Sequence, residues 1–401
     1  MWAKNYNVFS VDGQKAYVRK DRLSQLKHVD GVIFDCDGVL VDIRESYNKA
    51  VAKTVSYVLK ALTNSEIPER LISDELIYLF RKTGGFNNDW DTVYGTLMFI
   101  LCSLPDDCRG VLKKLITKIG TQQDPFKRLS SVAKEVEKAF KKDCLNEVFF
   151  EETVRNLKEF AKLLDASGIS SVDKVLAERA DTSRDFNAFY GVLSSFLYFP
   201  AEVGKSIIAT AQEEFFCGAK LFKQTFGVEP AFNNGSGMIE NEKIIIQPAV
   251  LEKLALLLGG RKLGIASGSW SRSAKYVLGD LIEQFDPKAL IFLENAEEAE
   301  RKLLKEKGLL LNLRKPNPYS LLKAAEGLGE PSSVLYVGDS MEDALMAEEA
   351  SKTGKSYVFS GVYRYSGLDD VVRDGFLESG CDIVIPSVND LPSILEAIRR
   401  E

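Results

Sequence analysis

The sequence predicts an α/β fold, in which a doubly wound parallel sheet carries a large all-helical insertion. Three observations support this fold class. A short apolar strand, GVIFD, occurs at residues 31–35. Residues from about 44 to 230 show only helical periodicity, and after residue 245 helical segments alternate with short apolar strands. Because such alternation is typical of parallel sheets covered by helices on both faces, the sheet should use both ends of the chain.

The N-terminal region reads YNVFSVDGQKAYVRK, with two apolar-rich runs around Asp12 and Gly13. This pattern predicts a β-hairpin. We therefore expect residues 1–30 to be an N-terminal extension that carries the hairpin. Residues 31–43 and 240–401 are expected to form the α/β core, and residues 44–239 the inserted helical domain.

The predicted insertion consists of segments with apolar residues at helical spacing, several of which begin with Ser, Asp or Asn in a capping position. These segments are RESYNKAVAKTVSYVLKAL, SDELIYLFRK, DWDTVYGTLMFILCSL, GVLKKLITKI, LSSVAKEVEKAFKK, EETVRNLKEFAKLLDA and EVGKSIIATAQEEFFCGAKLF. No strand of comparable quality interrupts them, and no repeat period is visible. The Gly-rich stretch EPAFNNGSGMIENEK at residues 229–243 is expected to return the chain to the core as a hinge.

The predicted core alternates between the two types of element after the insertion. Its expected helices are PAVLEKLALLLG, RSAKYVLGDLIEQF, NPYSLLKAAEGLG, MEDALMAEEASK, a segment near 367–379 and PSILEAIRR. Its expected strands are KLGIAS, ALIFLE, SVLYVGD, SYVFSG and DIVIP. In open sheets of this kind ligands bind beyond the carboxyl ends of the strands.

Composition excludes several functional classes. With 45% apolar and 27% charged residues, the 401-residue chain reads as a globular protein, and its net charge of −6 offers no basic field for nucleic acid. No apolar run is long enough to span a membrane, so we expect a cytoplasmic protein. The six cysteines form no CxxC pair and are expected to be reduced thiols. His28 is the only histidine, which argues against Ser-His-Asp catalysis and histidine metal sites.

Most of the chemically distinctive residues gather where the predicted strands end, and one, Lys315, instead precedes a predicted helix. They are Asp35 and Asp37 in GVIFDCDG, Ser267, Gly268 and Ser269 in KLGIASGS, Lys315 before NPYSLLKAA, and Asp339 and Asp343 in SVLYVGDSMEDALMA. Taken singly, these residues also fit helix caps or solvated charges. Two carboxylates at the end of a buried strand are harder to explain in this way, because desolvation of a charge is costly. A Mg²⁺ ion bound to their oxygen atoms would remove that cost.

Together these residues could form a receptor for a phosphoryl group. A cation and Lys315 would neutralise the phosphoryl oxygens, while the Ser267 hydroxyl and nearby backbone amides would donate hydrogen bonds. One aspartate could then attack phosphorus, and the other could exchange a proton with the leaving oxygen.

The four segments resemble, in the expected order, the four motifs of the haloacid dehalogenase (HAD) superfamily. FDCDGVLVD is similar to the first motif, IASGS to the second, Lys315 of RKPNPYSLLKAAEGLG to the third and VGDSMEDALMA to the fourth. The resemblance implies a Rossmann-like core with a helical cap. It also implies Asp35 as nucleophile and Asp37 as general acid/base.

The remaining roles follow from the same resemblance. Ser267, Gly268 and Lys315 would bind the phosphoryl group. Mg²⁺ would be bound by Asp35, by the backbone carbonyl of Asp37 and by Asp339, with Asp343 in support. The dehalogenases of the superfamily lack an acid at the position of Asp37, and its pumps need membrane helices that this sequence lacks. Among the lysines of the insertion, none is marked as the Schiff-base lysine of the phosphonatases.

One loop of the insertion, FRKTGGFNNDWDTVYG at residues 80–95, has two interpretations. The first is a turn between helices, with Gly85 as C-cap and Asn88 as N-cap. The second resembles the Gly-Gly-Phe-Asn stretch in the cap of some HAD phosphatases and assigns leaving-group contacts. The residues that would make these contacts are Arg81, Lys82, Asn87 and Asp89.

The sequence therefore predicts a Mg²⁺-dependent phosphatase that hydrolyses a small organic phosphate monoester through an aspartyl phosphate. The alternatives are a phosphomutase of the β-phosphoglucomutase type and a binding protein that has the HAD fold without turnover. The expected partner is a small phosphate ester, with no nucleic acid and no membrane. The physiological substrate, the oligomeric state and the role of the oversized insertion stay open.

Overall fold

A computed structural model describes residues 2–11, 13–86, 88–120, 124–141, 145–179 and 184–400. Contacts within the chain divide it into two compact units. The first is Met1–Arg44 with Glu242–Glu401, and the second is Glu45–Asn241. Strands β4 (Val41–Asp42) and β5 (Lys243–Ile244) pair antiparallel in the first unit, so the two segments that lead to and from the second unit lie side by side.

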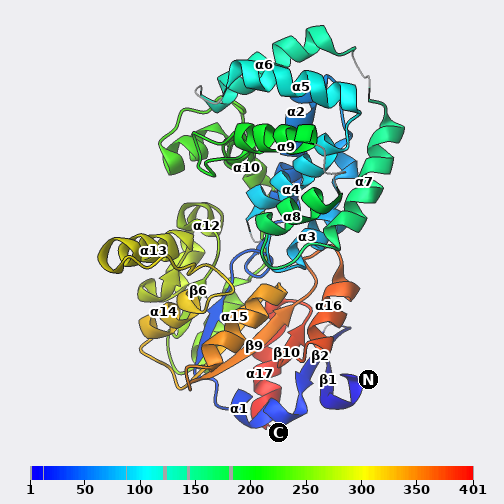
Figure 1. Cartoon of the computed structure of the whole chain (residues 1–401). Coiled ribbons are helices and arrows are strands. Elements are labelled where there is room, and N and C mark those ends of the chain that lie inside the picture. Colours follow the sequence, from blue (N-terminus) through cyan, green and yellow to red (C-terminus); the bar gives the residue numbers. More distant parts are fainter. Residues whose placement is uncertain are drawn as a thin grey trace. The chain divides into compact units, whose positions relative to one another are not determined.

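The first unit is built on an eight-stranded sheet with the order β1-β2-β10-β9-β8-β3-β6-β7 (Figure 1). Its strands are β1 (Tyr6–Val11), β2 (Gln14–Arg19), β3 (Gly31–Phe34), β6 (Leu263–Ala266), β7 (Leu290–Ile291), β8 (Ser333–Gly338), β9 (Ser356–Val362) and β10 (Ile383–Ile385). The six strands from β10 to β7 are parallel, and only the β1–β2 hairpin runs antiparallel at one edge. All residues of β3, β6 and β8 are buried, as expected for central strands covered on both faces.

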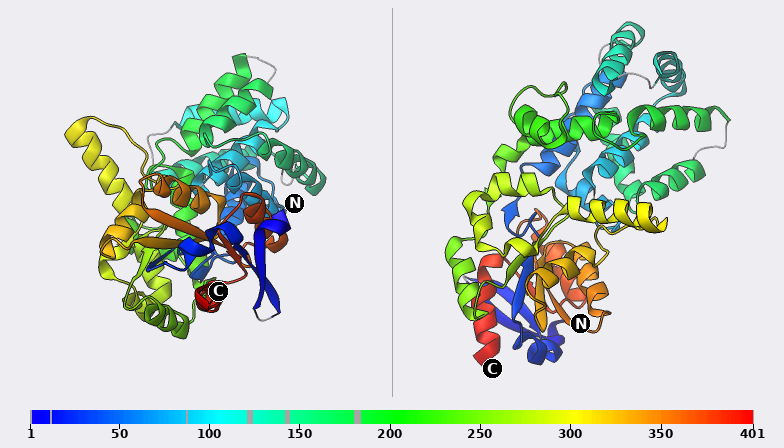
Figure 2. Two further views of the ribbon diagram at one scale, coloured as in Figure 1. Left: turned by 90° about the horizontal axis from the view of Figure 1, so that it is seen from below. Right: turned by 90° about the vertical axis from the view of Figure 1, so that its left-hand side faces the viewer.

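Helices cover both faces of this sheet, as the strand–helix alternation predicts. They are α1 (Leu23–Leu26), α11 (Pro248–Leu257), α12 (Ser271–Leu278), α13 (Leu293–Lys307), α14 (Tyr319–Gly327), α15 (Met341–Ser351), α16 (Asp369–Glu378) and α17 (Leu391–Arg400). Helices α11 and α17 contact each other on one face, and α14 and α15 contact the strands from the other (Figure 2). The fold of this unit is the doubly wound α/β core expected from the sequence.

Two segments of the core differ from the prediction. The expected strand ALIFLE is a strand only at Leu290–Ile291, and helix α13, which was not predicted, begins at Leu293. Its sequence is strongly charged and it buries only Ala296, so it shows little apolar periodicity. The expected helix RSAKYVLGDLIEQF ends at Leu278, because Gly279 adopts a positive φ of 53° and a 3₁₀ segment follows.

Helices joined by loops make up the second unit, and its described residues contain no strand apart from an isolated bridge. Its helices are α2 (Tyr47–Thr63), α3 (Asp74–Arg81), α4 (Asp89–Cys102), α5 (Asp106–Ile119), α6 (Pro125–Ala139), α7 (Glu147–Ala161), α8 (Ile169–Arg179), α9 (Arg184–Leu197) and α10 (Ile207–Phe226). Helix α4 is buried continuously over residues 92–102 and contacts α2, α7, α8, α9 and α10, so it forms the centre of this unit. Helices α8 and α9 were not among the predicted segments.

Helix α10 joins the helical unit to the return segment. It is interrupted at Gly218, where φ is 73° and ψ is 165°, and Gly218 pairs with Ser236 of the return segment. Among the helices in the described part of the chain, none is both long enough and apolar enough to cross a membrane.

Candidate active site

The register of the central strands brings two acidic segments to one edge of the sheet. Strands β3 and β8 pair in parallel, with Phe34 opposite Val337. The backbone N–H of Asp35 continues this ladder by donating to the Val337 carbonyl at 2.8 Å. Asp35 and Asp339 therefore follow neighbouring strands at the same carboxyl edge, which is where ligands bind in sheets of this kind.

The second acidic residue of the first motif contacts the loop after β6. Strand β6 pairs in parallel with β3, which places Ser267 and Ser269 just beyond the same edge. The Ser269 hydroxyl donates a hydrogen bond to Oδ2 of Asp37. Ser267 is buried, and its Oγ accepts the N–H of Ser269 at 3.2 Å. The Ser267 hydroxyl proton is therefore still available for a ligand.

Lys315 joins the first and fourth motifs. Its Nζ lies 2.9 Å from Oδ1 of Asp35 and 2.7 Å from Oδ1 of Asp343. The three side chains are 9%, 10% and 1% exposed, so these ion pairs are buried. Lys315 precedes α14 by a few residues and reaches the edge where Asp35 follows β3.

Asp343 is held by hydrogen bonds on both of its carboxylate oxygens. Its Oδ1 faces Lys315 and the hydroxyl of Tyr336, which lies 2.9 Å away. Its Oδ2 accepts the hydroxyl of Ser340 at 2.6 Å and the N–H of Ser340 at 3.1 Å, as part of the capping box that begins α15. A carboxylate whose oxygens accept this many hydrogen bonds is better suited to position Lys315 than to bind a cation directly.

The electrostatics of the site follow from burial and from the single lysine. Burial raises the pKa of Asp35 to about 7, because desolvation and the neighbouring acids outweigh Lys315. Burial alone would lower the pKa of Lys315, but the charges of Asp343 and Asp35 raise it well above its usual value. Burial favours the neutral form of Asp343 as well, yet Lys315 and the hydrogen-bond donors lower its pKa. Of the two acids that contact Lys315, Asp35 is therefore the one whose negative charge is not fully compensated by the lysine.

The acidic residues are close enough to share a divalent cation. Asp35, Asp339 and Asp343 each offer a carboxylate oxygen, and these atoms lie within 4.8 Å of one another. Cys36 N–H and Lys315 both contact Oδ1 of Asp35, while no described residue donates to its Oδ2. An all-oxygen set of this kind fits Mg²⁺. The Asp37 carboxylate is not part of this group, and the role of its backbone carbonyl as a cation ligand stays a prediction from the motif resemblance.

The family of the chain can be stated from sequence comparison. A protein-family model described as haloacid dehalogenase-like hydrolase matches residues 29–351. The chain belongs to this family. The comparison with curated protein sequences gives no match.

Comparison of this HAD-like hydrolase with solved structures gives matches at low sequence identity. An X-ray structure of a Northeast Structural Genomics Consortium target has a TM-score of 0.60 and 18% identity, and the match covers 93% of this chain and 100% of that chain. Phosphatase Tt82 from Thermococcus thioreducens has a TM-score of 0.41 and 18% identity, with coverage of 87% of this chain and 99% of that chain. The first comparison is a likeness of fold alone.

Two residues of the HAD-like site were given no role from the sequence. Tyr336 lies within the apolar strand β8, where a tyrosine reads as core, yet its hydroxyl contacts Asp343 and its ring lies 5.6 Å from Lys315 Nζ. Ser269 was noted at a strand end without a role, and it is the residue that hydrogen-bonds Asp37. The pairing of β6 with β3 brings Ser269 to Asp37, and the turn from β8 into α15 brings Asp343 to Tyr336.

The predicted specificity residues of the helical unit lie around the start of α4. Arg81 pairs with Asp89 at 2.9 Å, and Lys82 is the C-cap of α3. Asn87 lies outside the described residues. The turn interpretation also finds support, because Asn88 caps α4 by accepting the N–H of Trp90 at 3.0 Å. The positive φ falls on Gly84 rather than on the predicted C-cap Gly85. The leaving-group role of these residues stays a prediction.

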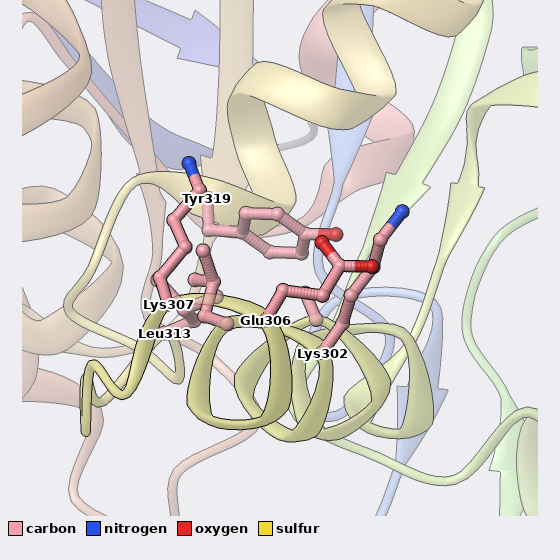
Figure 3. A pocket seen from close by; sticks show the side chains of 7 residues that line it. Lys302, Glu306, Lys307, Leu313 and Tyr319 are labelled. Atoms are coloured by element: carbon pink, nitrogen blue, oxygen red, sulfur yellow. The ribbon is translucent and has the colours of Figure 1, made fainter.

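A hollow of about 370 Å³ lies between α13 and the start of α14 (Figure 3). Its lining consists of Ala299, Lys302, Leu303, Glu306, Lys307, Leu313 and Tyr319. The lining includes Tyr319 from the stretch that contains Lys315, but none of the predicted catalytic, phosphate-binding or metal-binding residues. We therefore do not assign this hollow to the active site of the hydrolase.

Proposed function

We propose that this HAD-like hydrolase is a Mg²⁺-dependent phosphatase that hydrolyses a small organic phosphate monoester through an aspartyl phosphate. The observation that carries the proposal is the buried contact of Lys315 with Asp35 at 2.9 Å, beside carboxylates that can share a cation. A nucleophile, a fixed positive charge and a cation site within a few ångströms are what phosphoryl transfer needs.

In the first step, a carboxylate oxygen of Asp35 attacks phosphorus, and the bond between phosphorus and the ester oxygen breaks. Asp37 donates a proton to the departing oxygen and becomes a carboxylate. Its contact with the Ser269 hydroxyl supports this role, because the contact orients the side chain toward the strand edge where Asp35 lies. Lys315 and the Ser267 hydroxyl would hold the phosphoryl oxygens.

In the second step, Asp37 accepts a proton from a water molecule whose oxygen attacks phosphorus. The bond between Asp35 and phosphorus breaks, and inorganic phosphate leaves. Asp35 and Asp339, with the backbone carbonyl of Asp37, would hold the Mg²⁺, and Asp343 would fix Lys315. When bound, the cation supplies positive charge that keeps Asp35 ionised and offsets charge on the phosphoryl group.

A phosphatase screen over a panel of metabolite phosphates, with Mg²⁺ and with EDTA, tests the proposal. We expect release of inorganic phosphate from at least one monoester only when Mg²⁺ is present. Asp35→Asn should reduce the rate of phosphate release at least roughly 1,000-fold, because the amide oxygen is a poor nucleophile. Incubation with ³²P-labelled substrate and rapid acid quench should label the wild-type protein but not Asp35→Asn.

The same experiment separates the alternatives. A phosphomutase would return the label to a second hydroxyl of a sugar phosphate instead of releasing phosphate. A binding protein without turnover would bind phosphate esters and release nothing. The predicted cytoplasmic location is not part of this test and stays a prediction.

A further inference from the structure

Glu342 is an acidic residue next to the proposed site to which no motif assigns a role. It is the second residue of α15, between the proposed cation ligand Asp339 and the lysine-holding Asp343. Its Oε1 atom is buried and has no hydrogen-bond partner among the described residues. Glu342 lies in the first turn of α15, one residue before Asp343, whose carboxylate contacts Lys315. The Glu342 carboxylate is close enough to the cluster to interact electrostatically with Lys315 and with the acidic residues.

A buried carboxylate oxygen without a donor is unfavourable, because its interactions with water are lost and nothing replaces them. The described residues around Glu342 do not supply the donor. Lys315 already contacts two carboxylates, and the Ser340 hydroxyl donates to Asp343. The donor can therefore come only from outside the described residues, from a water molecule or from a group that binds to the site.

The charge and chemistry of the site restrict what this group can be. A phosphoryl group carries acceptor oxygens and negative charge, so it cannot satisfy a carboxylate. A divalent cation such as Mg²⁺ usually keeps several of its waters in proteins, and these waters are strong hydrogen-bond donors. The cation proposed between Asp35 and Asp339 would bring such waters to the cluster near which Glu342 lies.

We propose that Glu342 is a positioning residue of the cation site, and that its carboxylate accepts a hydrogen bond from the hydration shell of the bound cation. This inference rests on the cation of the proposed function but not on the substrate or on turnover. Residues that hold the outer shell of a metal typically change its affinity by about 10–100-fold. Glu342 should therefore increase cation affinity without contributing an oxygen to the inner shell.

Direct binding of Mn²⁺, measured by electron paramagnetic resonance of the free ion, tests the inference without any substrate. We expect Glu342→Gln and Glu342→Ala to raise the Mn²⁺ dissociation constant by about tenfold or more. Glu348→Gln is the matched control, because Glu348 is an exposed glutamate on the same helix. This control should bind Mn²⁺ as the wild type does.

Thermal unfolding separates positioning from a merely structural role. In EDTA we expect Glu342→Gln to unfold at the same temperature as the wild type or higher, because an unsatisfied buried charge is removed. The rise in melting temperature on adding Mn²⁺ should be smaller in this variant than in the wild type. If Glu342 were merely structural, its replacement would instead lower the melting temperature by the same amount with and without Mn²⁺.

The outcomes distinguish this inference from the proposed function. Equal Mn²⁺ affinity in the wild type and both variants would overturn the role of Glu342 and leave the phosphatase proposal standing. If the variants bind Mn²⁺ more weakly but the wild type hydrolyses no phosphate ester, the role of Glu342 at the cation site is supported and the phosphatase proposal is rejected. The inference is also wrong if the wild type binds no Mn²⁺, or if both variants are unfolded in EDTA and Mn²⁺ does not rescue them.

Discussion

Gly38 and Asp339 approach each other so closely that a side chain on the glycine cannot be accommodated. A Cβ atom built on Gly38 would lie 2.0 Å from Oδ2 of Asp339, and Gly38 has a positive φ of 71°. The turn within the first motif is thus packed directly against the carboxylate that is proposed to bind the cation. A glycine at this position allows the approach and the backbone conformation together.

We predict that Gly38→Ala impairs the site more than it impairs the fold. Displacement of Asp339 by about 1 Å should reduce phosphatase activity by roughly 100-fold and weaken Mn²⁺ binding. Gly354→Ala is the control, because Gly354 also has a positive φ, of 87°, but its Cβ would meet nothing within 4 Å. Both variants should lose about 1–2 kcal/mol of stability from backbone strain. An equal loss of activity in the two variants would contradict the role of the close approach.

The buried position of Lys315 gives a prediction about stability. Lys315→Met should lower the free energy of unfolding by about 3–5 kcal/mol in EDTA, because it leaves the carboxylates of Asp35 and Asp343 buried without the ammonium group that neutralises them. Lys323→Met is the comparison, since Lys323 pairs with Glu326 on the surface and is 44% exposed. That variant should change stability by less than about 1 kcal/mol in urea unfolding. Similar losses in both variants would show that the buried contacts of Lys315 do not stabilise the fold.

The sequence was sufficient to predict that Asp35 and Asp339 lie at one edge of the sheet, because parallel strands end at a common edge and both residues follow such ends. The convergence of Lys315 with Asp35 was predicted from the motif resemblance, because Lys315 precedes a helix and does not follow a strand. The sequence was not sufficient for Tyr336. In the run SVLYVG a tyrosine is indistinguishable from a core residue, and its contact with Asp343 depends on how the chain turns from β8 into α15. Helix α13 was missed for a related reason, since its charged sequence buries too little to show a helical stripe.

In the helical unit, Glu213 gives a prediction about pH. Burial raises the pKa of Glu213 to about 7, although the indole N–H of Trp90 donates to its Oε1 at 2.8 Å. The folded state therefore holds the proton that the unfolded chain releases near the usual pKa of about 4.3. The contribution of Glu213 to the free energy of unfolding is therefore fully present below the pKa of a glutamate in the unfolded chain. This contribution is lost as the pH rises to about 7, and the loss is on the order of 3 kcal/mol.

Glu213→Gln removes this titration and keeps an acceptor for Trp90. We expect the variant to unfold at a higher urea concentration than the wild type at pH 8, and at a similar concentration at pH 4.5. Replacement of the exposed Glu202 by Gln should not produce such a difference between the two pH values. A constant offset between Glu213→Gln and the wild type across this pH range would refute the assignment.

The neighbouring Glu214 holds the return segment against α10. Its Oε2 accepts the backbone N–H groups of Ala231, Phe232 and Asn233 at 2.8, 2.6 and 2.9 Å. The side-chain amide of Asn233 donates back to the Glu214 carbonyl at 3.1 Å. One carboxylate oxygen thus fixes three consecutive amides at the start of the Gly-rich stretch that was predicted to be a hinge.

We predict that Glu214→Ala releases this segment. Loss of hydrogen bonds to a charged acceptor should cost about 2–3 kcal/mol, and amide exchange at residues 231–233 should become faster by a larger factor than in the centre of α10. Glu214→Gln keeps one neutral acceptor and should show an intermediate effect. If exchange at these amides stays as slow in Glu214→Ala as in the wild type, other contacts hold the segment. Gly218 would then be the next position to substitute, because a Cβ added to it would lie 2.3 Å from the backbone nitrogen of Gly237.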